Sequence, residues 1–190
     1  GNFIYLTSFG KSPLRAFETG NETLPVAMAK AAIDVSNNGH NVWHSVNPVC
    51  VKPTDQKRGG ENVVSYQVAI VVDIDIKGDA HKAENLAANF DEAVSFLPIK
   101  PSALLDSGHG AQAYYIFDTP ILVTDQNREL LKRRNQLMLN VIRNNAGGKT
   151  IDAVGDLPRV MRTPCTFNYK LGNDNAPMCR VIAELVIESA

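Results

Sequence analysis

"VVSYQVAIVVDIDI" (residues 63–76) is the strongest β-strand signal in the chain, and it decides the predicted fold. The run is mostly apolar up to Val72, which is typical of a central strand that is buried on both faces. It ends with two aspartates two positions apart. Residues i and i+2 of a strand point to the same face, about 7 Å apart, so Asp73 and Asp75 should repel each other unless a cation or a shared proton compensates. The stretch therefore predicts a ligand bound at the end of a buried strand.

Periodic segments after this strand give a β-α-β-β-α-β order from residue 63 onward. Apolar positions in residues 79–97 recur with helical spacing up to Pro98, and residues 125–145 have the pattern of a charged amphipathic helix. A glycine turn inside residues 102–117 indicates a hairpin. The order predicts a split βαβ, ferredoxin-like sheet of the α+β class, built from residues 63–76, 79–97, 102–117, 125–145, 159–170 and 179–187.

A smaller α/β module is expected in front of this sheet. Residues 3–9 and 41–46 have the pattern of strands, and residues 24–37 have the pattern of a helix. A polar loop with two prolines and a Gly-Gly pair follows. We therefore expect an N-terminal module over residues 1–62 and a second module over residues 63–190, which together form one domain.

Composition excludes several classes of protein. No apolar run approaches the roughly 20 residues that span a membrane. Lys and Arg total 19 against 20 Asp and Glu, so a general basic field for DNA is missing and any nucleic-acid contact must be local. Three cysteines without a C-x-x-C pair favour neither a zinc site nor a disulfide framework, which is typical of the cytoplasm. The chain begins at Gly1 without a methionine, and we expect it to be cut from a longer chain.

The D-x-D pair at the strand end is the first candidate site. A turn at Gly78 follows it, where a substrate could reach a bound divalent cation. Two aspartates and a third carboxylate could hold two Mg²⁺ or Mn²⁺ ions about 4 Å apart, which is the arrangement that clamps the attacking and leaving oxygens in phosphoryl transfer. A solvated strand end is the alternative explanation of the pair.

The hairpin carries groups that suit a phosphate. Gly108 and Gly110 would let backbone N–H groups approach a phosphate closely, and Ser107 and His109 lie among them. A hairpin turn without any further role is the alternative.

Residues 152–170, "DAVGDLPRVMRTPCTFNYK", concentrate charged side chains in a short segment. They could supply a third metal-binding carboxylate and the cations that neutralise a triphosphate, or they could be the exposed charges of a strand. The residues concerned are Asp152, Asp156, Arg159, Arg162 and Lys170. In the polar loop before the central strand, Lys57 and Arg58 could contact DNA or a nucleotide.

Three of these segments, in this order, resemble the archaeo-eukaryotic primase (AEP) superfamily. Its signatures are an hDhD strand, a hairpin of the form S-G-x-G-x-H-x-Y and a segment D-x-x-R-h-h-R-x-P-G-T-x-N-x-K. Here they stand as "VVDIDI", "SGHGAQAYY" and "DLPRVMRTPCTFNYK". The likeness extends to "NVWHSVNP" and "KRGGENV", and so covers most of residues 41–190. It is strongest to the primase-polymerase domains of phages, plasmids and other mobile elements.

The resemblance implies a DNA primase and DNA polymerase domain, a template-directed nucleotidyltransferase with an RRM-like catalytic sheet joined to an N-terminal α/β module. Asp73 and Asp75 would bind Mg²⁺ or Mn²⁺, with Asp156 as the third carboxylate and Asp152 as its alternative. A single-stranded DNA template would be the partner, and the rest of a longer chain could carry a helicase or a DNA-binding domain. The triphosphate of an NTP or dNTP would be held by Ser107, Gly108, His109, Gln112, Arg159, Arg162 and Lys170.

The sequence departs from the family pattern at two positions. Gln112 stands where the phosphate-binding histidine is expected, and His109 lies three residues earlier, in the turn. Either side chain could donate a hydrogen bond to a phosphate oxygen. Cys165 stands where the family has a glycine. These departures leave a second hypothesis open, a catalytically weakened nucleotide- or nucleic-acid-binding module of a replication initiator.

Two other enzyme classes also use a D-x-D pair. A metal-dependent glycosyltransferase would leave the arginine-rich segment and the glycine hairpin unexplained. A Toprim-type primase needs a catalytic glutamate after an upstream strand, whereas Glu61 lies in a loop before the D-x-D strand itself. Both classes explain less of the sequence than the AEP resemblance does.

Overall fold

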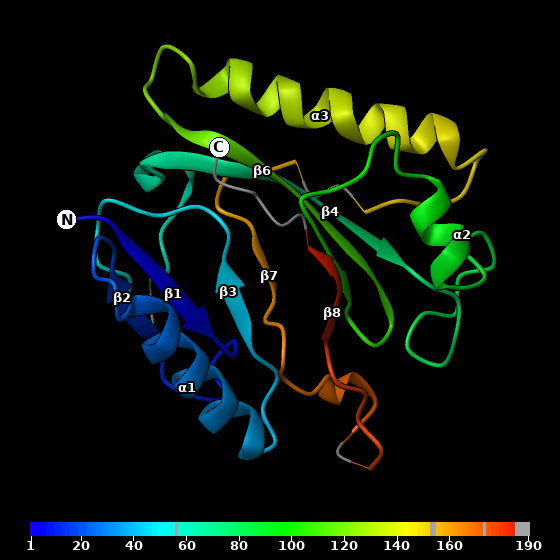
Figure 1. Cartoon of the computed structure of the whole chain (residues 1–190), viewed down its shortest axis with the longest axis horizontal. Helices are drawn as coiled ribbons and strands as arrows, with labels where there is room; N and C mark the ends of the chain where they lie inside the picture. Colours follow the sequence, from blue (N-terminus) through cyan, green and yellow to red (C-terminus); the bar gives the residue numbers. More distant parts are fainter. Residues whose placement is uncertain (56, 153–154, 173, 185–190) are drawn as a thin grey trace.

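The computed structural model describes residues 1–55, 57–152, 155–172 and 174–184, and in them the chain forms two four-stranded antiparallel sheets (Figure 1). The strand order is β2-β1-β3-β7 in the first sheet and β4-β6-β5-β8 in the second. The mixed α/β architecture predicted from the sequence is confirmed. No helix in the described ranges is long and apolar enough to cross a membrane.

The first sheet contains the N-terminal elements. Its strands are β1 (Phe3–Thr7), β2 (Arg15–Glu18), β3 (Trp43–Ser45) and β7 (Val160–Arg162). Helix α1 (Leu24–Asn37) has the predicted bounds and packs its buried Ala31, Ala32 and Val35 in one cluster with Leu6 and Val42.

The second sheet contains a split βαβ unit. Its strands are β4 (Tyr66–Asp75), β5 (Ala103–Asp106), β6 (Gly110–Leu122) and β8 (Arg180–Glu184). Strand β6 lies between β4 and β5 and is antiparallel to both, so β4 and β5 are parallel and are connected through α2 (Phe90–Ser95). Helix α3 (Arg128–Asn145) follows β6 and covers one face of the sheet (Figure 1). Two short 3₁₀ helices, Glu61–Val63 and Tyr169–Leu171, complete the described elements.

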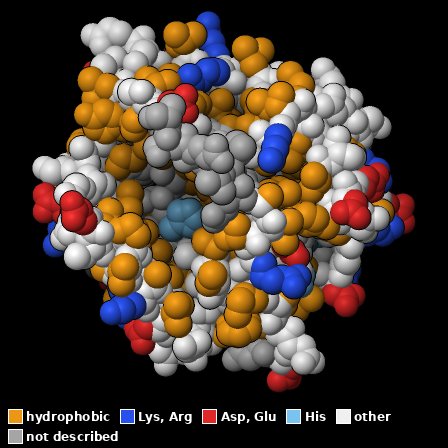
Figure 2. Space-filling model, in the orientation of Figure 1, with side chains coloured by type: hydrophobic (Ala, Val, Ile, Leu, Met, Phe, Trp, Pro, Cys, Tyr) orange, Lys and Arg blue, Asp and Glu red, His pale blue; other side chains and the backbone are white. Residues whose placement is uncertain are grey.

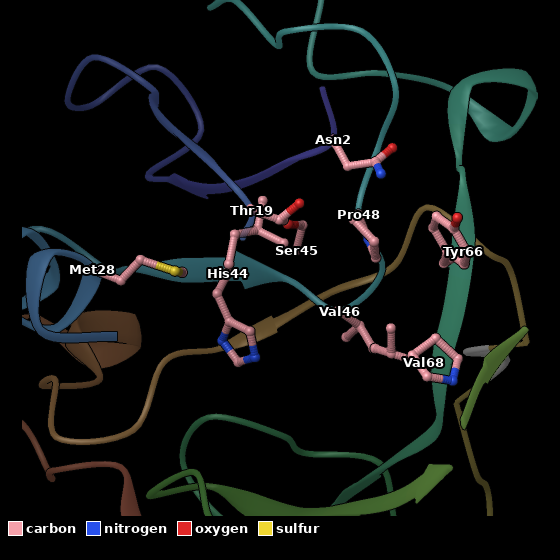
Figure 3. A pocket seen from close by; sticks show the side chains of 11 residues that line it. Asn2, Thr19, Met28, His44, Ser45, Val46, Pro48, Tyr66 and Val68 are labelled. Atoms are coloured by element: carbon pink, nitrogen blue, oxygen red, sulfur yellow. The ribbon is translucent and has the colours of Figure 1, made fainter. Parts of the chain in front are cut away.

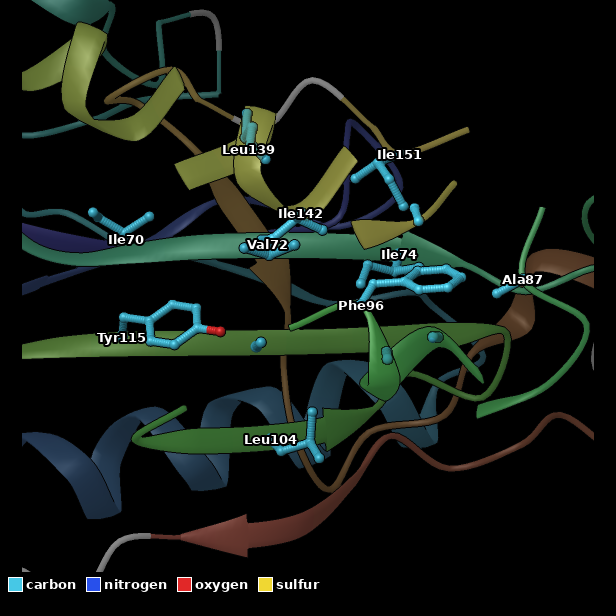
Figure 4. Packing of buried hydrophobic residues seen from close by; sticks show 14 residues of the cluster. Ile70, Val72, Ile74, Ala87, Phe96, Leu104, Tyr115, Leu139, Ile142 and Ile151 are labelled. Carbon is cyan, nitrogen blue, oxygen red and sulfur yellow. The ribbon is translucent and has the colours of Figure 1, made fainter. Parts of the chain in front are cut away.

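The alternation of side chains along β4 separates the core from the site. Ile70, Val72 and Ile74 point to the α3 face, where Leu139 and Ile142 of α3 pack on them (Figure 4). Each fully buried side chain of this kind contributes about 1.5–3 kcal/mol to the stability of the fold. The odd-numbered residues, beginning with Ala69 and Val71, point to the opposite face and pack on residues of the first sheet such as Met161. Asp73 and Asp75 continue this odd-numbered face, so the strand directs both carboxylates into the space between the two sheets.

The chain crosses between the sheets after α3. Strand β7 pairs antiparallel with β3 in the first sheet, with Trp43 opposite Arg162, and β8 then returns to pair with β5 in the second sheet. The two β segments predicted in this part of the chain are therefore present, but they lie in different sheets. The crossing brings the arginine-rich segment to the end of β4.

The predicted helix over residues 79–97 is wrong in its first half, because only Phe90–Ser95 is helical. The Asn89 side chain accepts a hydrogen bond from the Glu92 N–H and so caps a helix that begins at residue 90. Before it, the backbone is held in a loop, since the Lys77 N–H donates to the Ala87 carbonyl. Leu86 and Ala87 are buried from this loop, which satisfies the apolar pattern without a helical turn.

Candidate active site

A polar cavity of about 500 Å³ lies between the two sheets at the end of β4. The inward face of β4 supplies Asp73 and Asp75, and the hairpin between β5 and β6 supplies a second wall. Strands β3 and β7 supply the opposite wall through Trp43 and Arg162. Of the residues predicted from the sequence, it brings together Asp73, Asp75, Asp152, Ser107, His109, Gln112, Arg162 and Lys170.

The carboxylates of the cavity destabilise one another. Burial raises the pKa of Asp73 to about 7, and the negative charges of Asp75 and Asp152 add to this effect. Burial also raises the pKa of Asp75, whose Oδ2 lies 3.0 Å from His81 Nδ1. A divalent cation between these groups would remove the repulsion, so the donor set fits a hard cation with oxygen ligands. Among the described residues, no three His, Cys, Asp or Glu side chains already converge on a single metal position.

Two cations face these carboxylates. Arg162 is buried, donates from Nη1 to Asn41 Oδ1 at 2.7 Å and lies over the Trp43 ring, 4.8 Å from its centroid. Lys170 donates from Nζ to His81 Nε2 at 2.9 Å. One guanidinium is therefore held by packing, whereas the lysine is exposed and contacts His81.

The β5–β6 hairpin is ordered by its own hydrogen bonds. The Ser107 N–H and hydroxyl both donate to the Gly110 carbonyl, at 2.9 and 3.1 Å, and the Gly108 N–H donates to Asp106 Oδ1 at 2.8 Å. Asn168 donates from Nδ2 to the Ser107 carbonyl at 2.7 Å and ties the turn to the segment after β7. The amides of Ser107 and Gly108 are thus engaged inside the turn, and side chains are left to contact a ligand.

Two buried polar atoms in this cavity have no hydrogen-bond partner among the described residues, His109 Nε2 and Gln112 Oε1. Gln112 lies opposite Asp73 in the sheet register and donates from Nε2 to its carboxylate at 3.4 Å. A buried polar atom that stays unpaired costs about 1–3 kcal/mol. The pair therefore indicates that a polar ligand completes the cavity. Burial lowers the pKa of His109, so this ring is neutral at pH 7.

Asp156 and Arg159 lie outside this cavity. They pair with each other and line a separate cavity of about 310 Å³, which Arg58 also lines. Lys57 is exposed and lines neither cavity. The structure thus places Asp152, the alternative third carboxylate, beside Asp73 and Asp75, and places Asp156 elsewhere.

Several residues of the cavity were not singled out in the sequence. Asn41 Oδ1 accepts hydrogen bonds from Arg162 and from the Tyr169 N–H, at 2.7 and 2.8 Å. Asn41 lies two residues before Trp43, the first residue of β3, and only the register of β3 with β7 brings Arg162 opposite Trp43. His81 stands in the loop after the D-x-D pair and carries no recognisable pattern.

Cys165, the second departure from the family pattern, has a φ of 61°. This left-handed conformation favours glycine and costs other residues about 1–2 kcal/mol. Glycine would adopt this φ without that cost, so the cysteine is accommodated at a cost.

Gly110 is needed for the close approach of β6 to β4 beside Asp75. A Cβ atom there would lie 2.7 Å from the Ile74 carbonyl oxygen. We expect Gly110→Ala to lower the free energy of unfolding by about 1–3 kcal/mol, as measured by chemical denaturation. Gly78→Ala is the matched control, because a Cβ there meets nothing within 4 Å. Equal stability of Gly110→Ala and the wild type would contradict this packing.

The raised pKa of Asp73 predicts an unusual pH dependence of stability in the metal-free protein. Its carboxyl binds a proton more tightly in the folded state, with a pKa of about 7, than at the ordinary value of 3.8. Stability is therefore expected to fall as pH rises from about 4 to 7, by roughly 4 kcal/mol from this group. Thermal unfolding at pH 5 and pH 8 measures the upper part of this range, where a loss of about 3 kcal/mol is expected, and Asp73→Asn should flatten it. If the wild type is more stable than Asp73→Asn at pH 8, the raised pKa assigned to Asp73 is wrong.

A second cavity of about 500 Å³ lies on the other side of β3 and is lined mostly by apolar side chains (Figure 3). On the face shown in Figure 2, hydrophobic side chains lie beside a hollow in which a histidine is visible. His44 lines this cavity, and burial lowers its pKa to about 4, so the ring is neutral. None of the described residues that line this cavity is charged, in contrast to the cavity at the end of β4.

Comparisons with solved structures identify the fold. Neither a scan of protein-family models nor a search of curated proteins finds a match. Among solved structures, the AEP domain of the cyanophage S-2L primase-polymerase is similar over 96% of this chain and 80% of its own, with a TM-score of 0.53 and 16% identity. Primase RepB′ is similar over 96% of this chain and 51% of its own, with a TM-score of 0.52 and 10% identity. The chain therefore has the fold of an AEP primase-polymerase domain, with its polar cavity at the end of the D-x-D strand.

Proposed function

We propose that this chain is the catalytic domain of a primase-polymerase and transfers nucleotidyl groups from an NTP or dNTP to a growing strand on a single-stranded DNA template. The observation that carries the proposal is the cavity itself. It sets three aspartates against Arg162 and Lys170 between the two sheets of a primase fold. Carboxylates for metal ions and cations for a triphosphate are the two charge sets that phosphoryl transfer requires.

Asp73 and Asp75 are the residues that would hold Mg²⁺ or Mn²⁺, with Asp152 as the third carboxylate. When bound, such ions would supply charge neutralisation at the α-phosphate and a lowered pKa of the attacking 3′-hydroxyl. The fixed strand geometry keeps the first two carboxylates on one face, so little reorganisation is needed at the moment of reaction. Gln112 orients Asp73 from the neighbouring strand, and His81 contacts Asp75.

The opposite wall would hold the triphosphate. Arg162 is fixed by Asn41 and Trp43 and offers a planar guanidinium, while Lys170 offers a mobile point charge. The unpartnered His109 Nε2 points to a phosphate oxygen as its partner if the imidazole proton is on that nitrogen. Catalysis in this arrangement is mainly positioning and charge neutralisation.

One observation favours the second hypothesis, a nucleotide- or nucleic-acid-binding module with weakened catalysis. Gln112 is neutral and buried where the family pattern has a histidine, so one proton or positive charge is missing from the cavity. Against it stands the cost of three facing carboxylates, since a module that no longer bound metal would be more stable without them.

Nucleotide binding tests the proposal before any turnover is required. We expect calorimetry to show that a dNTP or NTP binds the wild type in the presence of Mn²⁺ and at least tenfold more weakly with a chelator. Arg162→Lys, which keeps the charge but loses the planar contact with Asn41 and Trp43, should weaken binding about tenfold. Binding of equal strength with and without Mn²⁺ would contradict a metal-dependent transferase and support the binding module.

A further inference from the structure

Cationic and aromatic side chains alternate in a row that leads out of the polar cavity. The Arg162 guanidinium lies over the Trp43 ring, 4.8 Å from its centroid. Trp43 meets Phe9 edge to face, with ring centroids 4.6 Å apart. Arg58 lies over Phe9 at 4.4 Å. These four side chains, the cation–aromatic row, come from β7, β3, the turn after β1 and the polar loop before β4.

The row joins two polar cavities. Trp43 and Arg162 line the cavity that contains Asp73, whereas Phe9 and Arg58 line the cavity of about 310 Å³ that contains Asp156. A ligand in contact with the whole row must therefore extend from one cavity to the other. A strand of several nucleotides would be long enough to reach both.

Packing alone does not explain why the Phe9 ring is exposed. Its side chain is 49% exposed, although it is a large aromatic ring. Its φ of 50° is in the left-handed region, where a residue other than glycine costs about 1–2 kcal/mol. Glycine would suit the turn better, so the exposed ring points to a surface role.

The charges beside Phe9 suit a phosphate backbone. Asp156 is paired with Arg159, so the positive charge of Arg58 is the net charge that the second cavity presents. Lys57, next to Arg58, is exposed. Aromatic faces with neighbouring guanidinium groups bind single-stranded nucleic acid, because every base can stack on them and the cations follow the backbone.

We propose that the cation–aromatic row is a stacking platform for the single-stranded template, which runs past Phe9 and Arg58 and enters the cavity at Trp43. This inference rests on the proposed function, because it assigns the template side of the same site. It commits to a single strand, since a duplex would keep its bases stacked on one another and leave the rings unused.

Trp43 is the only tryptophan of the chain, so its fluorescence reports on the row directly. We would titrate the protein with a 12-nucleotide oligo-dT, without metal or nucleotide, and follow Trp43 emission and the anisotropy of a labelled strand together. We expect saturable quenching with the same midpoint by both signals. Phe9→Leu, which keeps an apolar side chain but removes the ring, should weaken strand binding roughly 5- to 100-fold.

Charge is tested in the same titration. Arg58→Gln should lower the slope of log affinity against log salt by about 0.7, the value for one phosphate contact on a single strand. Lys100→Gln, which removes an exposed cation between α2 and β5, is the matched control and should leave the affinity within twofold. Thermal unfolding confirms that each variant is folded.

The platform is overturned if Phe9→Leu and Arg58→Gln bind the strand as tightly as Lys100→Gln does, or if the strand binds without a change in Trp43 emission. Calorimetry of Mn²⁺-dependent nucleotide binding on the same variants separates this result from a failure of the proposed function. If nucleotide binding is intact but strand binding is unchanged by substitutions in the row, only the platform is rejected. If the wild type binds the strand through the row but binds no nucleotide, only the proposed transferase function is rejected.

Discussion

Asp73→Asn is expected to abolish nucleotidyl transfer and, at the same time, to stabilise the metal-free protein. The variant removes a proposed metal ligand, which should lower the rate of transfer by about 10³-fold or more. It also removes a buried carboxyl whose pKa is raised to about 7 by burial and by Asp75 and Asp152. Above pH 7 the gain in the free energy of unfolding should reach about 1–4 kcal/mol. Primer extension and chemical denaturation at pH 8 measure the two effects.

Asp79→Asn is the matched control for this prediction. Asp79 lies in the loop after β4, carries the same charge and is exposed. Its substitution should leave the rate of transfer unchanged and should change the free energy of unfolding by no more than about 0.5 kcal/mol. Loss of stability in Asp73→Asn would contradict the electrostatic account of the site, even if activity were lost as expected.

The second large effect separates two carboxylates that the sequence left as alternatives. We expect Asp152→Asn to reduce primer extension by about 100-fold or more, because Asp152 lines the cavity with Asp73 and Asp75. Asp156→Asn should stay within a few-fold of the wild type at saturating template, because Asp156 is paired with Arg159 in the other cavity. Single-turnover rates at saturating Mn²⁺ compare the two variants directly.

The reverse pattern would contradict the assignment of the third carboxylate. A large loss in Asp156→Asn with near-normal Asp152→Asn would mean that the segment between α3 and β7 rearranges around the ions. Mn²⁺ titration by calorimetry then gives an independent answer, since the variant that lacks a true ligand binds the metal more weakly.

Local patterns in the sequence predicted the elements that surround the site. The apolar run that ends in Asp73 and Asp75 predicted a buried strand, and a two-residue period is enough to place both carboxylates on one face. The predicted central position of this strand is wrong, because β4 lies at the edge of its sheet. The glycine turn predicted the hairpin of β5 and β6, in which Gln112 pairs with Leu105. These features depend on neighbours in sequence, so they could be found without the structure.

Features that depend on long-range pairing could not be found in this way. Only the pairing of β7 with β3 brings Arg162 next to Trp43, across more than a hundred residues. The same crossing places Asp152 in the cavity of Asp73 and Asp156 in the other cavity. These two residues lie four positions apart, so no local pattern shows which one lies near β4. The loop before α2 was not predicted for a related reason. Tertiary contacts bury Leu86 and Ala87, and the spacing of these apolar residues resembles that of a helix.

Metal-dependent primer extension is the measurement that tests the central claim most directly. Wild type, Asp73→Asn and Asp79→Asn would be incubated with labelled dNTPs or NTPs and a primed template, with Mn²⁺, with Mg²⁺ or with a chelator, beside an unprimed single strand. The account predicts extension by the wild type and Asp79→Asn that requires a divalent ion, and none by Asp73→Asn. Extension that survives Asp73→Asn, or no extension by the wild type although nucleotide and Mn²⁺ bind, would contradict the claim that this cavity is the active site of a polymerase.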